Sequence, residues 1–416
     1  MTTARPMIRP FTGLRPQSAH AAAVAAPPYD VLSSEEARQR AAGKPYSFLH
    51  ISKAEIDLPP EVDHYAPEVY AKSAENLKKL IDAGVLFRDK TPCYYAYRLV
   101  MGSHTQTGLI AAASVADYDS NRIRKHEFTR PDKEDDRVRQ IEALNAQTGP
   151  VLLAHPDSDE AEQLIAAATA GTPIADLTAD DGIKHTVWLI DDEATIARIS
   201  AVVGAMPNLY IADGHHRYGV SRVYRDMVRK ATGRKDTAAE LTLTFINELV
   251  DDQLSIEAIH RIYDGLSFDE LKNALSGSFT IEPMTEPLGP ATLAQMVETE
   301  RLVLLDPKGE PSWLVARPGA FNGVRALDGA WLEHALSGSK AQVSYQHGLD
   351  EVLAELDNAG TGPFGGHAGA VLIRPTSLAE IERTAREGLL MPPKSTFFTP
   401  KLRTGLVIRP TQRLPR

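Results

Sequence analysis

The segment from Leu209 to Tyr218 holds the densest group of residues that could do chemistry. An apolar run ends at Ala212, and five polar, basic or flexible residues follow it: Asp213, Gly214, His215, His216 and Arg217. Asp213 stands where a helix N-cap is expected, and Gly214 lets the backbone come close to a ligand. The N–H groups of the first helical turn and the basic side chains would together attract an anion. The segment therefore predicts a phosphate site at a helix N-terminus, with a capped helix and surface histidines as the alternative.

A second charged segment, 122–137, has two apolar residues, Ile123 and Phe128, that would anchor it to the core. Three residues with chemically useful side chains stand between these anchors: Lys125, His126 and Glu127. A lysine supplies a cation for a phosphate, and a carboxylate takes up a proton or binds Mg²⁺. A solvated charged loop is the alternative interpretation, as for any run of charges.

Two further segments combine rigid prolines with polar groups. Near the C-terminus, a proline pair is followed by one charge and two hydroxyls, which suit a phosphate or a carboxylate: Lys394, Ser395 and Thr396. A structural tail that docks on the core explains this segment equally well. Near the N-terminus, another proline pair presents Tyr29 and Asp30 on a turn.

The elements that must position these residues are strands mixed with helices. Runs of apolar and β-branched residues predict strands over 93–101, 107–115, 185–190, 208–212 and 241–249. A long amphipathic helix is predicted after the Asp213–Arg217 string, with Val220, Tyr224 and Val228 on one face. Beyond Arg261 the predicted elements become shorter. This mixture is typical of an α+β fold and is too irregular for a doubly wound sheet.

The chain has 416 residues, 43% of them apolar, and a formal net charge of −10. This length predicts two to three domains in an ordinary globular protein. The sequence contains no run of 18 apolar residues and no signal-type apolar stretch, so we expect neither a membrane span nor a signal sequence. The acidic excess argues against a protein that coats nucleic acid, because such binding depends on neutralising phosphates. Cys93 is the one cysteine, which excludes an internal disulfide and fits the reducing cytoplasm.

Taken together, these segments resemble the bacterial and archaeal domain-of-unknown-function family 1015, often labelled ParB-like. The likeness covers nearly the whole chain, from residue 9 to about residue 408. Its matching pieces are Arg9-Pro10-Phe11, Gly13-Leu14-Arg15-Pro16, Pro27-Pro28-Tyr29-Asp30-Val31, Lys125-His126-Glu127, Lys133, Asp136-Arg137, Asp213-Gly214-His215-His216-Arg217 and Met391-Pro392-Pro393-Lys394-Ser395-Thr396-Phe397-Phe398.

That family is similar to a distant branch of the ParB/sulfiredoxin superfamily. The resemblance implies an α+β fold, in which a ParB/sulfiredoxin-like mixed core carries large insertions and a smaller α/β part lies at the C-terminus. We expect the nucleotide- or phosphate-binding core, with its N-terminal elaboration, over residues 1–265. An α+β C-terminal region is expected over residues 266–416, with a tail, 391–408, that returns to the site.

The Asp213–Arg217 string is similar to the phosphate motif of the free-serine kinases in that superfamily. This likeness implies ATP or ADP with Mg²⁺ as cofactors, held through Gly214, His215, His216, Arg217, Lys125 and His126. Contacts to the substrate or its phosphate would come from Tyr29, Lys133, Arg137, Lys394, Ser395 and Thr396. The ligands of the metal are left open.

The predicted activity is phosphoryl transfer on a free small hydroxylated metabolite, L-serine and O-phosphoserine first, in the direction of a serine kinase or a phosphoserine phosphatase. The migrating phosphoryl charge would be neutralised by His215, His216, Arg217 and Lys125, which is most of what such catalysis requires. Glu127, Asp30 and Asp213 compete for the role of the catalytic base. The alternatives are a non-enzymatic ParB-like nucleotide-binding switch that binds DNA or a protein partner, and a metal-dependent phosphohydrolase. We expect a small-molecule ligand and neither a membrane nor a nucleic acid as partner, and a homodimer stays open.

Overall fold

The computed structural model describes residues 6–127, 131–357, 366–392 and 394–411, with the backbone alone for 131–134 and 290. These residues form two compact units. The first unit takes residues 6–125, 131–255 and 400–411, and the second takes residues 126–127 and 256–399. The first unit is therefore assembled from stretches of chain that precede and follow most of the second.

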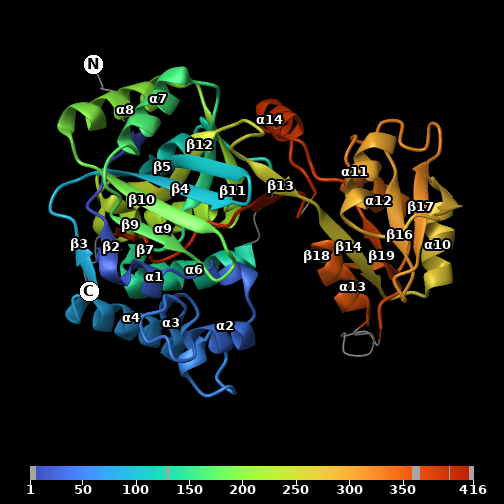
Figure 1. The fold of residues 1–416 in the computed structure, drawn as a ribbon, viewed down its shortest axis with the longest axis horizontal. Helices are drawn as coiled ribbons and strands as arrows, with labels where there is room; N and C mark the ends of the chain where they lie inside the picture. Colours follow the sequence, from blue (N-terminus) through green and yellow to red (C-terminus); the bar gives the residue numbers. More distant parts are fainter. Residues whose placement is uncertain (1–5, 128–130, 358–365, 393, 412–416) are drawn as a thin grey trace. The chain divides into compact units, whose positions relative to one another are not determined.

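A mixed nine-stranded sheet forms the centre of the first unit (Figure 1). Its strands lie in the order β6 (Ile123–Arg124), β11 (Leu209–Asp213), β8 (Val151–His155), β12 (Leu241–Glu248), β5 (His104–Ser114), β4 (Tyr94–Met101), β10 (Lys184–Ile190) and β9 (Ala175–Thr178), and β1 (Ile8–Arg9) also pairs with β5. β11 runs parallel to β6, and β12 runs parallel to β8, whereas the remaining described pairs are antiparallel. The mixture of helices and mixed strands confirms the predicted α+β class.

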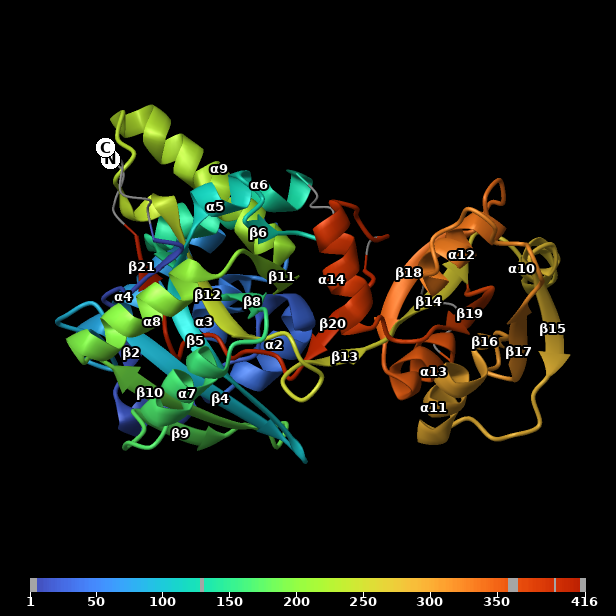
Figure 2. The same cartoon turned by 90° about the horizontal axis from the view of Figure 1, so that it is seen from above.

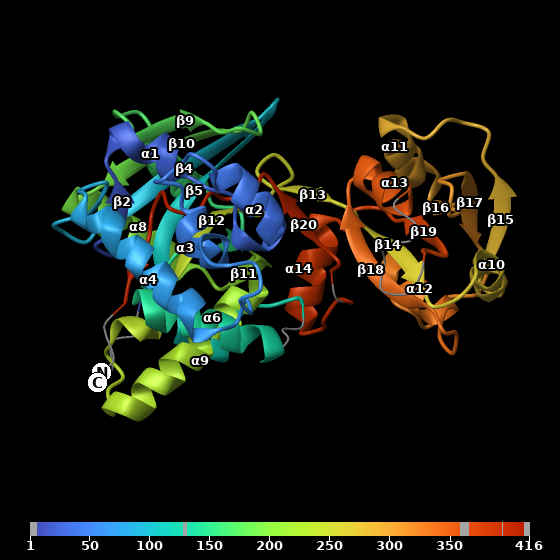
Figure 3. The same cartoon turned by 90° about the horizontal axis from the view of Figure 1, so that it is seen from below.

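Helices cover both faces of this sheet. α7 (Asp159–Ala168) and α8 (Glu193–Ala205) lie on one face, where Ile165, Ile199 and Val203 pack into the main core (Figure 1). On the other side lie α1 (Ala21–Val24), α2 (Ser34–Ala41), α3 (Leu49–Ser52) and α4 (Pro67–Asp82). Figure 3 shows α3 beside α4 in this second layer. The sheet is therefore buried on both faces.

The helix that follows the Asp213–Arg217 string is α9 (His215–Thr232), and it lies beside α6 (Pro131–Leu144) (Figure 2). Its apolar face packs as the spacing predicts, because Tyr224 and Val228 form a buried cluster with Ala239, and the partly buried Ile141 packs against it. α6 also packs against α4. This packing brings the first turn of α9 and the middle of α6 into one neighbourhood.

The segment after residue 399 completes the first unit. β21 (Arg409–Pro410) pairs with β7 (Ala146–Gln147), and bridge pairs join Leu14 to Ile408 and Ala26 to Thr404. Residues from the two ends of the sequence are therefore hydrogen-bonded neighbours.

The second unit has a six-stranded sheet whose described pairs are all antiparallel. Its strands lie in the order β15 (Phe279–Pro283), β17 (Pro311–Ala316), β16 (Leu302–Leu305), β19 (Gly369–Leu372), β14 (Ile259–Asp264) and β18 (Gln342–His347). α10 (Phe268–Ser276) and α12 (Asp328–Ala335) lie on one face, and α11 (Pro290–Thr299) and α13 (Leu349–Asp357) on the other (Figure 2). The unit also contains α14 (Leu378–Glu387) and a ribbon of β13 (Ser255–Glu257) with β20 (Phe397–Thr399).

Among the helices that the structure describes, none combines the length and the apolar character that crossing a membrane requires.

Candidate functional site

The corner between β11 and α9 is formed by Asp213 and Gly214. Gly214 is the N-cap residue of α9, and its φ of 90° lies in the left-handed region that favours glycine. Because glycine has no side chain, the first turn of α9 receives no side-chain cap. The prediction that Asp213 caps the helix is therefore wrong. β11 continues through Asp213, and its carboxylate turns toward Lys401 and Arg217.

The side chain of Arg217 folds back along the start of α9. A Cβ atom on Gly214 would lie 3.0 Å from Arg217 Nε, and one on Gly149 would lie 3.5 Å from its Cδ, so the two glycines leave the space that this side chain fills. Nη1 donates to the carbonyl of Pro150, and Nη2 lies 3.6 Å from Asp213 Oδ2. Nε and Nη2 donate no hydrogen bond to any described residue, although the side chain is only 16% exposed.

The carboxylate of Asp213 is held between two cations. Lys401 Nζ donates to its Oδ2 over 3.0 Å, and the Arg217 guanidinium lies on the same oxygen. Burial raises the pKa of Asp213, but Lys401 and Arg217 outweigh burial and hold this pKa well below its usual range. Burial likewise lowers the pKa of Arg217, and Asp213, Asp30 and Tyr29 reverse that effect and raise it. Both groups are therefore charged at neutral pH, and an ionised carboxylate with so low a pKa is a poor proton acceptor.

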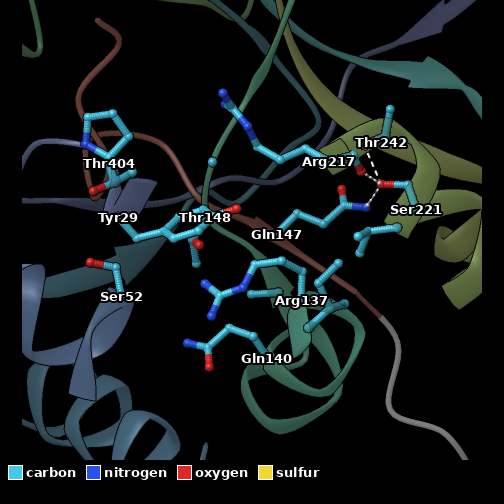
Figure 4. Close-up of a pocket in the computed structure, with 15 residues that line it drawn as sticks. Tyr29, Ser52, Arg137, Gln140, Gln147, Thr148, Arg217, Ser221, Thr242 and Thr404 are labelled. Atoms are coloured by element: carbon cyan, nitrogen blue, oxygen red, sulfur yellow. Dashed lines mark hydrogen bonds between the residues drawn. The ribbon is translucent and has the colours of Figure 1, made fainter. Parts of the chain in front are cut away.

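A pocket of about 60 Å³ lies between the first turn of α9, α6, the turn Thr148–Gly149 and the segment around Tyr29 (Figure 4). A single buried water needs roughly 10–15 Å³ of such space. The pocket therefore has room for a small metabolite and does not enclose a whole nucleotide. Figure 4 shows Arg217 and Arg137 on opposite sides of Tyr29 and Thr148.

Arg137 reaches this pocket from α6. Its guanidinium carbon lies 4.2 Å from the ring centre of Tyr29, and its Nε donates to Asp136 Oδ2 over 2.7 Å. The hydroxyl of Tyr70 donates to the other oxygen of Asp136 over 2.6 Å. Burial and Asp30 raise the pKa of Tyr29 to about 12, against the lowering effect of Arg137 and Arg217. Tyr29 is thus protonated at neutral pH, close to two guanidinium groups.

A hydrogen-bond network supports the α9 wall of the pocket. Gln147 Oε1 accepts from the backbone of Leu243 and from Arg409 Nη1, each over 2.9 Å. This fixes its Nε2 at 3.3 Å from Ser221 Oγ, which in turn lies 2.7 Å from Thr242 Oγ1 (Figure 4). The hydroxyl of Ser52, in contrast, is buried beside the pocket and has no hydrogen-bond partner among the described residues.

The other predicted residues of the first unit are not among those that line this pocket. Asp30 is exposed on the same short turn as Tyr29. In the first turn of α9, His215 is buried and His216 is half-buried. Lys125 is exposed, with Nζ 5.6 Å from the ring centre of Tyr118. Lys133 belongs to α6, and its side chain lies outside the described part of the chain.

The remaining predicted residues belong to the second unit, where the structure brings two of the predicted segments together. His126 Nε2 lies 3.4 Å from Thr396 Oγ1. Glu127 Oε1 accepts from the backbone N–H of Lys394 over 3.2 Å. Ser395 Oγ donates to the carbonyl of Pro392 over 2.7 Å, so this hydroxyl is used within its own turn. The two segments form one local cluster in the second unit.

Several pocket residues were missed by the sequence-based reasoning. Ser52, Gln147 and Thr148 are ordinary polar residues in unremarkable surroundings, and only the packing of α3, α6 and β7 brings them to the pocket. Gly149 carried a usable signal, because a glycine before Pro150 marks a turn between two strands. Lys401 stands next to the Lys394–Thr396 segment, but its partner Asp213 is 188 residues away.

The chain belongs to the family described as "Protein of unknown function (DUF1015)", whose model matches residues 8–330. No curated protein matches the sequence. Solved structures that are similar to this chain include a conserved hypothetical protein from Pyrococcus furiosus, with 11% identity, a TM-score of 0.36, and coverage of 70% of this chain and 90% of that chain. A variant of a free serine kinase in complex with ADP has 12% identity, a TM-score of 0.36, and coverage of 70% and 87%. SbnI with a C-terminal truncation, from Staphylococcus aureus, has 15% identity, a TM-score of 0.34, and coverage of 70% and 84%. Likenesses at this level assign no activity to the chain.

Proposed function

We propose that the first unit is a phosphotransferase that moves a phosphoryl group between a nucleotide and a small hydroxylated metabolite. One observation carries the proposal: Arg217 lies against Gly214 at the start of α9, with Nε and Nη2 donating to no described residue. A helix N-terminus attracts anions, and a guanidinium beside it binds two phosphate oxygens at once. L-Serine and O-phosphoserine are the first substrates to test, because of the likeness of the Asp213–Arg217 string to the free-serine kinases.

In this proposal the phosphoryl group is bound at the corner of β11 and α9. Arg217 neutralises the charge that spreads over its oxygens during transfer, which is the main requirement of this chemistry. Lys401 and Asp213 act as positioning residues, because their ion pair holds the corner and keeps Arg217 charged. The proton of the acceptor hydroxyl is taken up by Asp30.

Asp30 is preferred over the other two carboxylates for a chemical reason. The two cations on Asp213 hold its pKa too low for an efficient base. Glu127 accepts a hydrogen bond from the backbone of Lys394 in the second unit. Asp30 lies on the turn that carries Tyr29 into the pocket, it is close enough to Arg217 to raise that pKa, and it forms no ion pair with a described residue.

The residues present fit the phosphates of ATP or ADP, with Gly214 and Arg217 as the groups that would hold them. Such a nucleotide supplies or accepts the phosphoryl group when bound, and its base and sugar would lie outside the 60 Å³ pocket. The fit to a divalent cation is poorer, because Mg²⁺ requires oxygen ligands and Asp213 already holds two cations. We therefore propose Mg²⁺ only as the counter-ion of the nucleotide.

A phosphotransfer assay with matched variants tests the proposal. ATP or ADP is incubated with L-serine, and O-phosphoserine with ADP or with water, and both directions are followed by ³¹P NMR. Arg217→Ala should lower turnover by about 100-fold, as expected for loss of a group that stabilises the transition state. Arg222→Ala is the matched control, because Arg222 is an exposed arginine of the same helix. Turnover that is absent, or that is the same in the Arg217 and Arg222 variants, would contradict the proposal.

A further inference from the structure

We infer that the pocket of the first unit has a second anion subsite, centred on Arg137, that binds a carboxylate group of the metabolite. The inference rests on the proposed function for the other end of the ligand, the phosphoryl group at Arg217. It narrows the small hydroxylated metabolites of the proposed function to those that also carry a carboxylate.

The first observation is that one of the N–H groups of Arg137 has no acceptor among the described residues. Nε and Nη2 are paired with Asp136, and the guanidinium carbon lies over the ring of Tyr29. Nη1 donates to no described residue, although the side chain is only 20% exposed. A guanidinium that is held in place by its neighbours and keeps one donor toward a pocket is a pre-organised site for an oxygen ligand.

The unsatisfied hydroxyl of Ser52 is the second, independent observation. Its Oγ is buried without a hydrogen-bond partner among the described residues, and such a group is rare in a folded protein unless a ligand or a water completes it. Gln140 fixes its place, because its Nε2 donates to the carbonyl of Ile51 over 3.0 Å. Gln140 and Arg137 lie one turn apart on α6. The same helix therefore carries the free guanidinium donor and holds the segment that presents the hydroxyl.

The two subsites lie at different ends of the pocket. Figure 4 shows Ser52, Arg137 and Gln140 on one side of Tyr29 and Thr148, and Arg217 on the other. Both guanidinium groups lower the pKa of Tyr29, so both lie near its ring. They do not share a carboxylate, because Arg137 pairs with Asp136 and Arg217 pairs with Asp213. A ligand that binds both guanidinium groups needs an anionic group at each end.

Charge and size favour a carboxylate over a second phosphate at Arg137. Asp136 already neutralises this arginine, so a dianionic phosphate would meet a carboxylate without a compensating cation. A carboxylate has a single charge and two oxygens, which match the two available donors, Arg137 Nη1 and Ser52 Oγ. The pocket of about 60 Å³ also has little space for two phosphates.

The test compares two ligands that differ by one carboxylate. O-Phospho-L-serine and O-phosphoethanolamine share the phosphate and the amine, and only the first has the carboxylate. Binding of each to the full chain is measured by isothermal titration calorimetry, without any need for turnover. The wild type should bind O-phospho-L-serine about tenfold or more tightly than O-phosphoethanolamine, which is the usual size of a charged hydrogen bond.

Three variants test which residues make the protein prefer O-phospho-L-serine to O-phosphoethanolamine. Arg137→Gln should abolish the difference between the two ligands and leave the affinity for O-phosphoethanolamine within about twofold. Ser52→Ala, a smaller change, should reduce the difference in part. Arg139→Gln is the control, because Arg139 is an exposed arginine of α6 paired with Asp135 over 2.7 Å. Thermal melting establishes that each variant is folded.

The outcomes separate the inference from the proposed function. If the wild type binds both ligands equally, binds neither, or keeps its discrimination in both the Arg137 and Ser52 variants, the carboxylate subsite is wrong. The proposed function fails on a different result, namely no Arg217-dependent phosphoryl transfer in the ³¹P assay. Discrimination without transfer would therefore support the subsite and reject the phosphotransferase.

Discussion

Lys401 Nζ donates a 3.0 Å hydrogen bond to Asp213 Oδ2, and this contact joins the segment after residue 399 to the start of α9. Lys401→Met removes it and leaves Arg217, 3.6 Å away, as the remaining cation on this oxygen. We expect the free energy of unfolding at pH 7 to fall by about 1–3 kcal/mol, as for other hydrogen bonds to charged groups. Urea titrations measure the change, and Lys230→Met, at an exposed lysine of α9, serves as the control.

The same substitution should change the response to acid. The folded-state pKa of Asp213 is depressed below the unfolded value of about 3.9, so its stabilising contribution is present above that value and is lost as the pH falls through the folded-state pKa. Lys401→Met moves the folded-state pKa upward, so less of this contribution remains and the rest is lost at higher pH. Acid unfolding followed by circular dichroism should therefore have its midpoint at a higher pH than in the wild type. An unchanged midpoint would show that Lys401 does not control Asp213.

Gly214→Ala and Gly233→Ala separate backbone strain from damage to the proposed phosphate site. Both glycines have positive φ, 90° and 68°, and they stand at the two ends of α9. Each substitution should cost about 1–2 kcal/mol of stability. The added Cβ at position 214 would also press on Arg217 Nε, whereas the one at 233 meets nothing within 4 Å. We therefore expect only Gly214→Ala to weaken binding of inorganic phosphate, measured by calorimetry, and equal affinities in the two variants would contradict this account.

His185 should make the first unit sensitive to mild acid. It is fully buried, its Nδ1 lies 2.8 Å from the hydroxyl of Tyr97, and Arg403 Nε donates to its Nε2 over 3.4 Å. Burial, followed by Arg403, lowers the pKa of His185 to about 4. Because the unfolded state binds the proton from about pH 6.5 downward, stability is lost as the pH falls from about 6.5 to 4, by about 3 kcal/mol in total.

Histidine NMR signals measure this titration directly. The C2–H signal of His185 should keep its neutral position at pH 6, where an exposed histidine is mostly protonated, and His185→Gln identifies the signal by its loss. His260 is the internal comparison in the second unit, because burial lowers its pKa to about 4 as well. A His185 signal that titrates near pH 6.5 would refute the prediction.

Cys93 should be inert toward thiol reagents in the folded protein. It is 1% exposed, and burial raises the pKa of its thiol to about 11. The reactive thiolate is therefore both rare and inaccessible at pH 8. Labelling with a chromogenic disulfide reagent should be slow in buffer and complete in denaturant, with one thiol per chain. Rapid labelling under native conditions would show that the first unit opens near β4.

Local sequence signals predicted the strand and the helix that meet at Asp213 and Gly214 better than the surroundings of this corner. The apolar run before Asp213 is β11, and the amphipathic spacing after Gly214 is α9, because both patterns follow from burial of one face. The error at Asp213 is informative. A carboxylate next to a helix start is normally a cap, but a lysine 188 residues away offers it a stronger partner here.

Elements without a local signal were not predicted. The strand β18 reads Gln-Val-Ser-Tyr-Gln-His, and most of its residues are exposed, so no alternating apolar face marks it. It exists because its backbone pairs with all of β14. The sequence did not predict that Ser52 and Arg137 line the same pocket. The contact between α3 and α6 that brings them together depends on tertiary packing, which leaves no local signal.

The return of residues 400–410 to the first unit sets the order in which that unit can be completed during synthesis. Asp213 and Gln147 leave the ribosome long before their partners Lys401 and Arg409, and the whole stretch 256–399 is made in between. Domains generally fold as units during synthesis, so the second unit can reach its native state while the first still lacks β21. The corner between β11 and α9 is therefore assembled late, and a nascent chain that stops before residue 401 carries an open pocket.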